Sequence, residues 1–165
     1  MYVLGVDPGL SATGYGVVAG GGDGVRAIAA GAIRTRPASS VAERLAELYE
    51  DLEGLITEFG PDEVAVEAVF VNRNLQTATS VARACGVALL AAARAGLEVF
   101  EYTPSAVKLA VTGDGNAGKD QVQTVVARRL RLGEEPKPAD AADALAVALC
   151  HLQAAPLRRA VEGAS

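Results

Sequence analysis

The sequence predicts an α/β fold in which a five-stranded mixed sheet is flanked by helices. Three strand-like segments lie within the first 35 residues and are separated only by short glycine-containing turns, which is the pattern of an antiparallel meander. Two later strand-like segments, residues 63–67 and 97–102, each follow a helix-like segment. Strands that are entered through helices favour a mixed sheet whose faces are covered by those helices.

The three opening strands are short and apolar. The stretch 2–18 contains the first two, and a Pro-Gly turn separates them directly after an acid, Asp7, that ends the first strand. Residues 20–24 read GGGDG, which predicts a hairpin turn, and residues 25–35 then form the third strand. Asp7 is unusual because a core strand that ends in a carboxylate places a charge at the edge of the sheet.

Helices are expected where apolar residues recur every three or four positions. These segments are residues 39–59, 75–95, 103–113, 119–131 and 140–151. Either Ser39 or Ser40 is suited to cap the first helix, and Thr103 followed by Pro104 is a typical start for the third. We expect residues 1–153 to form a single domain and residues 154–165 to be a disordered tail.

Composition limits the possible function classes. The chain has 165 residues, half of them hydrophobic, and a net charge of −5, which argues against non-specific binding of polyanions unless acids are neutralised locally by metal ions. Cys85 and Cys150 form no metal-binding motif and are expected to be free thiols in a reducing cytosol. Because neither a signal peptide nor an apolar run of about 18 residues is evident, we expect a cytoplasmic protein.

Four acids stand out by their position. Asp7 and Glu67 each end an apolar strand, and Asp140 and Asp143 are three residues apart on a helix that is otherwise apolar. Three of these acids also have a simpler explanation. Asp7 is also a suitable turn residue, and the helical pair also suits the N-terminus of its helix.

Together, the four acids indicate an all-oxygen metal site. If the two strands are adjacent and parallel, their carboxylates meet at one sheet edge, and the last helix can add its pair. Oxygen ligands without His or Cys select Mg²⁺ or Mn²⁺, and four carboxylates suit two ions about 3.5–4 Å apart that clamp a phosphodiester. His151 is eleven residues beyond Asp140 in the sequence, or ~16 Å along the helix, so we expect it to be structural or exposed.

Several motifs occur in a recognisable order along the chain. They are VDPG at 6–9, TGYG at 13–16, EAVF at 67–70, VFEY at 99–102 with Val107-Lys108 after it, and ADAADALA at 139–146. This series resembles the bacterial Holliday-junction resolvases of the RuvC family. The resemblance is collinear from residue 2 to about residue 153.

The resemblance implies a ribonuclease H-like fold and a homodimer that nicks four-way DNA junctions symmetrically, leaving 5′-phosphate and 3′-hydroxyl ends. It also implies dependence on Mg²⁺ or Mn²⁺, a short thymine-containing cleavage sequence, and cooperation with the RuvA–RuvB branch-migration complex. The residues that it assigns are the catalytic metal ligands Asp7, Glu67, Asp140 and Asp143, the stacking aromatic Phe70, and the DNA-contacting Lys108 and Lys119. Arg73, flanked by two asparagines, could contact phosphate or be a solvated loop charge.

Two other functions fit parts of the sequence. A strand that ends in Asp-x-Gly also opens the actin/Hsp70-like ATPases, but that architecture needs a second half of similar size, and only one such turn occurs here in a strand context. A non-catalytic module that binds junctions or RNA is the other alternative. The presence of all four acids argues against a site that has lost its activity.

Overall fold

The computed structural model of the chain describes residues 1–22, 24–69 and 75–162, with side chains as far as Pro156. Strands and helices follow one another along it in the expected order. They are β1 (Tyr2–Asp7), β2 (Ala12–Gly21), β3 (Gly24–Arg34), α1 (Val41–Phe59), β4 (Glu63–Glu67), α2 (Leu75–Arg94), β5 (Glu98–Tyr102), α3 (Pro104–Thr112), α4 (Lys119–Arg129) and α5 (Ala139–Glu162).

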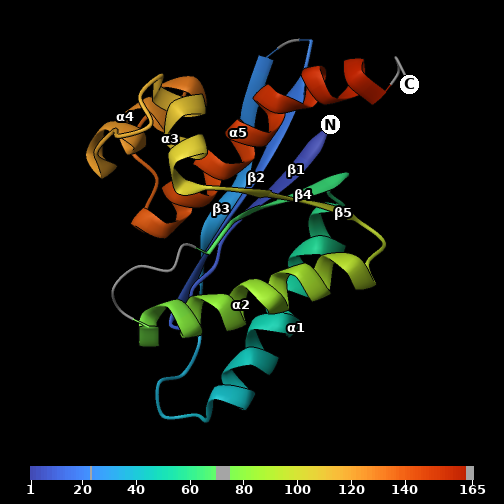
Figure 1. The fold of residues 1–165 in the computed structure, drawn as a ribbon, viewed down its shortest axis with the longest axis vertical. Helices are drawn as coiled ribbons and strands as arrows, with labels where there is room; N and C mark the ends of the chain where they lie inside the picture. Colours follow the sequence, from blue (N-terminus) through green and yellow to red (C-terminus); the bar gives the residue numbers. More distant parts are fainter. Residues whose placement is uncertain (23, 70–74, 163–165) are drawn as a thin grey trace.

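Across the described residues, the strands form one five-stranded sheet in the order β3-β2-β1-β4-β5 (Figure 1). β1 is antiparallel to β2 and parallel to β4, and β4 is parallel to β5. The sheet is therefore mixed, as the sequence predicted. β1 lies at its centre, so the strand that carries Asp7 has a partner on each side.

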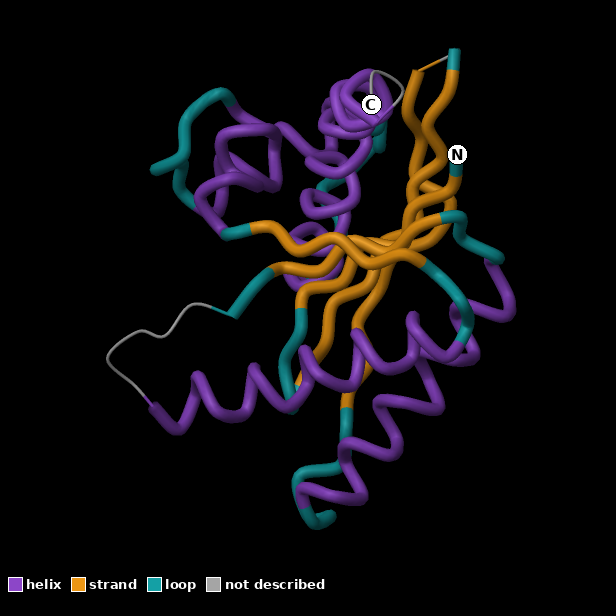
Figure 2. Tube along the Cα trace, turned by 45° about the vertical axis from the view of Figure 1, so that its right-hand side comes forward, coloured by secondary structure: helices purple, strands orange, loops and turns teal. Residues whose placement is uncertain are grey.

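Helices cover both faces of the sheet. α1 and α2 lie on one face, and α3, α4 and α5 lie on the other, as the two views in Figures 1 and 2 agree. Each face has its own hydrophobic core. One core joins Leu4 and Val66 of the sheet to Leu48 and Leu52 of α1 and to the small residues of α2.

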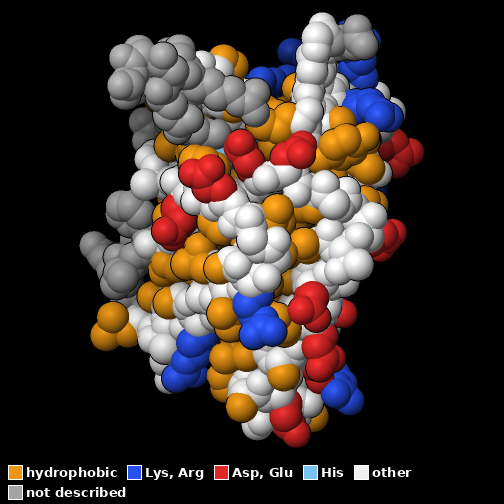
Figure 3. All heavy atoms as spheres, turned by 90° about the vertical axis from the view of Figure 1, so that its right-hand side faces the viewer, with side chains coloured by type: hydrophobic (Ala, Val, Ile, Leu, Met, Phe, Trp, Pro, Cys, Tyr) orange, Lys and Arg blue, Asp and Glu red, His pale blue; other side chains and the backbone are white. Residues whose placement is uncertain are grey.

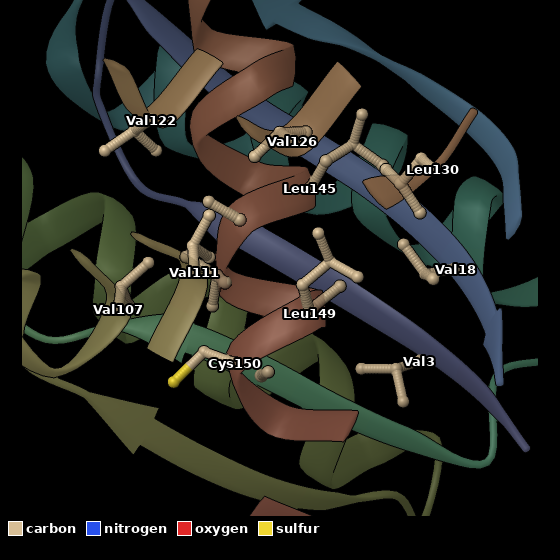
Figure 4. Close-up of a cluster of buried hydrophobic side chains, with 14 of the residues drawn as sticks. Val3, Val18, Val107, Val111, Val122, Val126, Leu130, Leu145, Leu149 and Cys150 are labelled. Carbon is tan, nitrogen blue, oxygen red and sulfur yellow. The ribbon is translucent and has the colours of Figure 1, made fainter. Parts of the chain in front are cut away.

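The second core holds α3 and α4 against α5. Figure 4 shows Val107 and Val111 from α3 and Val122 and Val126 from α4 around Leu145 and other side chains of α5. Because valine and leucine supply most of this surface, burial of apolar side chains is the main contribution that fixes the two short helices. This packing determines where the first residue of α4 lies.

Local signals account for the helix starts. Ser40 caps α1 and forms a capping box with Glu43, and the left-handed Gly60 ends the helix. Thr103 accepts a hydrogen bond from the amide of Ala106 and caps α3 ahead of Pro104. Both N-termini therefore begin where the sequence predicted, and Ser40 rather than Ser39 is the cap.

The expected tail is wrong for residues 154–162, because α5 continues to Glu162. Pro156 lies inside this helix and removes one backbone donor without ending the helix. Ala155 is buried, so the helix is still attached to the core at that point, and the residues beyond Pro156 are mostly good helix formers. The last three residues, 163–165, lie outside the described part of the chain.

α2 is long and apolar enough, by length and composition alone, to cross a membrane. That indication is weak, because the core helix of a soluble protein passes the same test. Here α2 buries a face of small residues, among them Ala84, Ala88 and Ala92, in the same core as β4 and α1. Its opposite side is exposed and includes Leu90.

Candidate active site

The parallel pairing of β1 and β4 brings two of the acids together. Their register places Val6 beside Val66, so the next residue of each strand, Asp7 and Glu67, emerges at the same edge of the sheet. The side chains of these two acids share a hydrogen bond. The sequence analysis required the two strands to be adjacent and parallel, and they are.

Glycines in the sheet let α5 bring in the other two acids. Gly14 is the partner of Asp7 in the β1–β2 ladder, and a Cβ atom at Gly14 would collide with the backbone carbonyl of Asp140. A Cβ atom at Gly5 would collide with the backbone of Ala144 one turn further along α5. The helix backbone therefore rests directly on the backbone of β1 and β2, in a position that larger residues would fill. A Cβ atom at Gly16 would meet Leu145 of the same helix, and we call Gly5, Gly14 and Gly16 the glycine seat.

Electrostatic interactions link all four carboxyl groups. The pKa of Asp7 is raised to about 8, first by burial and then by the charges of Glu67, Asp143 and Asp140. Burial, followed by the charge of Asp143, also raises the pKa of Glu67. The site therefore concentrates negative charge in a place where water compensates it poorly.

The donor atoms are not arranged around a common point in this structure. Among residues 1–22, 24–69 and 75–162, no three Asp, Glu, His or Cys side chains are close enough to hold one metal ion together.

Two lysines adjoin the acids. Lys108 of α3 and Lys119 of α4 line a pocket of about 220 Å³ that is also bordered by Glu67 and Asp143. The ammonium Nζ of Lys119 lies 2.8 Å from Oδ2 of Asp143, and this ion pair raises the pKa of Lys119. The structure thus places both predicted lysines beside the acids.

The turn after Asp7 is held by residues that the sequence analysis did not identify. The hydroxyl of buried Thr13 donates to the carbonyl of Gly9 at 2.7 Å and accepts from its amide at 3.2 Å. The hydroxyl of Thr35 donates to the carbonyl of Leu10. These bonds fix the chain directly beyond Asp7. The TGYG motif contains Thr13 and was the available signal for it.

A second layer supports the same turn. Arg44 of α1 donates from Nε to the hydroxyl of Thr35 at 2.8 Å and from Nη2 to the hydroxyl of Ser11 at 3.0 Å. Arg44 is the one basic residue among the acids of α1, but nothing in the sequence indicates which hydroxyl groups it contacts. Its role depends on how α1 packs, which only the structure shows.

The remaining predicted residues have different outcomes. Phe70 and Arg73 lie outside the described residues. His151 is fully buried, and its Nε2 lies 2.5 Å from Oε2 of Glu63 while its Nδ1 lies 3.0 Å from the hydroxyl of Tyr102. His151 thus links α5 to β4 and β5, which confirms the structural interpretation.

This chain is similar to known proteins over nearly its whole length. The family model described as crossover junction endodeoxyribonuclease RuvC matches residues 3–151. The chain belongs to this family. A crossover junction endodeoxyribonuclease RuvC from Natranaerobius thermophilus is 49% identical over 158 residues, which cover 96% of this chain and 98% of the relative.

Solved structures of family members superpose closely. The Thermus thermophilus RuvC structure has a TM-score of 0.88 and 37% identity, and the match covers 96% of this chain and 97% of the other. T. thermophilus RuvC in complex with Holliday junction substrate has a TM-score of 0.86 and 35% identity, with coverage of 95% and 96%. The fold is accordingly ribonuclease H-like, which confirms what the motifs implied.

Proposed function

We propose that the chain is a Holliday-junction resolving endonuclease that hydrolyses phosphodiester bonds at four-way DNA junctions by paired, symmetric nicks. One observation carries the proposal: carboxyl groups from β1, β4 and α5 lie near enough to interact through their charges, beside two lysines, in a member of the RuvC family. The solved complex of a similar RuvC with Holliday junction substrate supports the choice of DNA substrate.

The acids fit divalent metal ions as ligands. Their donors are all oxygen, and burial first, followed by the charges of the neighbouring acids, raises the pKa of Asp7, so a divalent cation would stabilise the ionised carboxylates there. Mg²⁺ or Mn²⁺, held as two ions by Asp7, Glu67, Asp140 and Asp143, would supply an activated water and stabilise the leaving 3′ oxygen, leaving 5′-phosphate ends.

The chain's own groups account for positioning of the substrate. Lys108 and Lys119 place two ammonium groups at the pocket beside Glu67 and Asp143, where a DNA phosphate would be attracted. We assign Phe70 to stacking on an unpaired base, an interaction of about 1–3 kcal/mol. Arg73 is assigned to a phosphate of the same strand. These last two assignments rest on the family motif and on the spacing from Glu67.

The proposal includes partners and location. Symmetric nicking of two strands requires two active sites, so the working form is a homodimer, and cleavage follows junction movement by a RuvA–RuvB complex in the cytoplasm. A short thymine-containing sequence is the expected preference. The homodimer, the RuvA–RuvB complex, the cytoplasmic location and the sequence preference all follow from the family resemblance. Each concerns the same step of DNA recombination and repair.

The two alternatives are not favoured. An actin/Hsp70-like ATPase half-domain would share the strand-Asp-x-Gly start, but the family match extends over nearly the whole chain. A module without catalysis would have no reason to keep four neighbouring carboxyl groups, because burying unpaired charge destabilises a fold.

The deciding experiment compares a labelled synthetic four-way junction with a linear duplex of the same sequence. We expect Mg²⁺ or Mn²⁺ to support paired nicks in the junction, and we expect the duplex, or a chelator, to give none. ATP turnover is measured in parallel. Hydrolysis of ATP without nicking of the junction would overturn the proposal, and binding without nicking under every metal condition would favour the non-catalytic module.

A further inference from the structure

The ion pair between Lys119 and Asp143 joins a candidate metal ligand to a cation that the protein itself supplies. Nζ of Lys119 lies 2.8 Å from Oδ2 of Asp143, and the side chain of Lys119 remains 59% exposed. The charges of Asp7 and Asp140 also act on this ammonium group. One lysine therefore faces the same group of acids that would hold the metal.

The position of Lys119 is built by the fold. Val122 and Val126 of α4 are buried in the core that α3 and α5 share (Figure 4). Ala117 is buried just before the helix. The backbone of Lys119 is thus anchored, while its four-carbon side chain ends at the surface and can change partners.

Helix stability does not explain this lysine. It is the first residue of α4, where the helix dipole favours acids, and the residue that follows, Asp120, is of the kind expected there. A cation at this end is slightly unfavourable for the helix. The nearby carboxylates account for it better.

We propose that Lys119 is the internal counter-ion of the metal-free active site, holding Asp143 until a divalent cation displaces it and thereby setting the affinity for that cation. The inference rests on the proposed function, because it takes Asp143 as a metal ligand. A displaced ammonium group remains at the mouth of the pocket, where a DNA phosphate is its natural next partner. Lys119 is a positioning residue in this scheme.

The test measures metal affinity without DNA, so that it does not depend on cleavage. Free Mn²⁺ is followed by its electron paramagnetic resonance signal during titration of the full chain and of Lys119→Gln. Removing the competing ammonium should lower the Kd for Mn²⁺ by about fivefold, the upper range for a partly exposed ion pair. Lys119→Arg keeps a cation beside Asp143 and should stay within about twofold of the parent.

A matched control separates this effect from net charge. Arg26 of β3 is exposed and level with Tyr2, five residues from Asp7, or ~17 Å along the strands, so Arg26→Gln should leave the Kd unchanged. Equal Kd values for Lys119→Gln and the parent, or weaker binding by the variant, would overturn the counter-ion role and leave the nuclease proposal standing. Failure of the parent itself to bind Mn²⁺ would instead contradict the metal-dependent function.

Discussion

Asp7 is a partly buried carboxyl group at the end of β1, and its pKa is raised to about 8 because burial and three neighbouring acids disfavour its charge. In the unfolded chain the same group has an ordinary pKa of 3.8. Between these two values the folded chain retains a proton that the unfolded chain releases. Folding stability must therefore fall as the pH rises through that window.

We expect the metal-free chain to be less stable at pH 7.5 than at pH 5, and we expect Asp7→Asn to reduce that difference because it removes the main titrating group. Urea unfolding at the two pH values in a chelator measures the effect. Mg²⁺ added at pH 7.5 should restore stability to the parent by compensating the carboxylates. A parent whose stability rises over this range would contradict the electrostatic description of the site.

At the scale of residues, the four acids could be picked out as candidates from the sequence because each is a charged residue at the boundary of an apolar segment. Asp7 and Glu67 end apolar strands, and Asp140 and Asp143 lie at the start of an apolar helix. The sequence could not predict pairs that depend on packing. Lys119 of α4 forms an ion pair with Asp143 of α5, and His151 contacts Glu63, which is 88 residues away in the sequence. The partners in such contacts are ordinary charged residues in their own segments, so nothing local marks them.

The glycine seat is the feature at the scale of elements that determines the geometry of the site. Gly14 lies between Asp7, its ladder partner, and Asp140 of α5. A side chain there would push the start of α5 away from the sheet and separate the two pairs of acids. The close packing of α5 on the sheet and the proximity of the four acids therefore depend on the same glycines.

Gly14→Ala should lower the free energy of unfolding by about 1–3 kcal/mol or more, because its Cβ atom meets rigid backbone. The variant should also bind Mn²⁺ more weakly than the parent. Gly54→Ala is the matched control, since Gly54 lies inside α1 with no atom within 4 Å of its added Cβ. That change should be neutral or stabilising by up to about 1 kcal/mol. Unchanged stability and Mn²⁺ binding in Gly14→Ala would show that α5 does not depend on the seat.

Element positions were the more predictable part of the fold. Capping signals such as Ser40 with Glu43 and Thr103 with Pro104 are local, so they can be read without the structure. The end of α5 was placed too early because the contact of Ala155 with the core depends on tertiary packing, which no local signal shows. Strand order likewise required the structure, since only the pairing of β1 with β4 shows that Asp7 and Glu67 are neighbours.

At the scale of the whole molecule, acidic residues outnumber basic ones, 20 to 15. On the face shown in Figure 3, basic side chains form separate groups among acidic ones, with apolar side chains between them. The net charge is −5. Attraction to DNA in this protein therefore depends on a few placed groups, such as Lys108 and Lys119, and on neutralisation of the acids by metal ions.

The proposed paired nicking also requires two copies of the chain. We expect sedimentation velocity to give a dimer at the concentrations used for cleavage, because one active site reaches only one of the two strands at a time. A monomer that still nicks both strands in a single binding event would contradict the dimeric mechanism.

The central claim is that Asp7, Glu67, Asp140 and Asp143 form the metal-dependent centre that cuts the junction. Its most direct test is cleavage of a labelled four-way junction by Asp7→Asn, with junction binding measured on the same preparation and with Asp51→Asn, an exposed acid of α1, as the control. We predict that Asp7→Asn loses cleavage by a factor of at least about 100 while its junction affinity is retained, and that Asp51→Asn cuts normally. Normal cleavage by Asp7→Asn would contradict the assignment of the site.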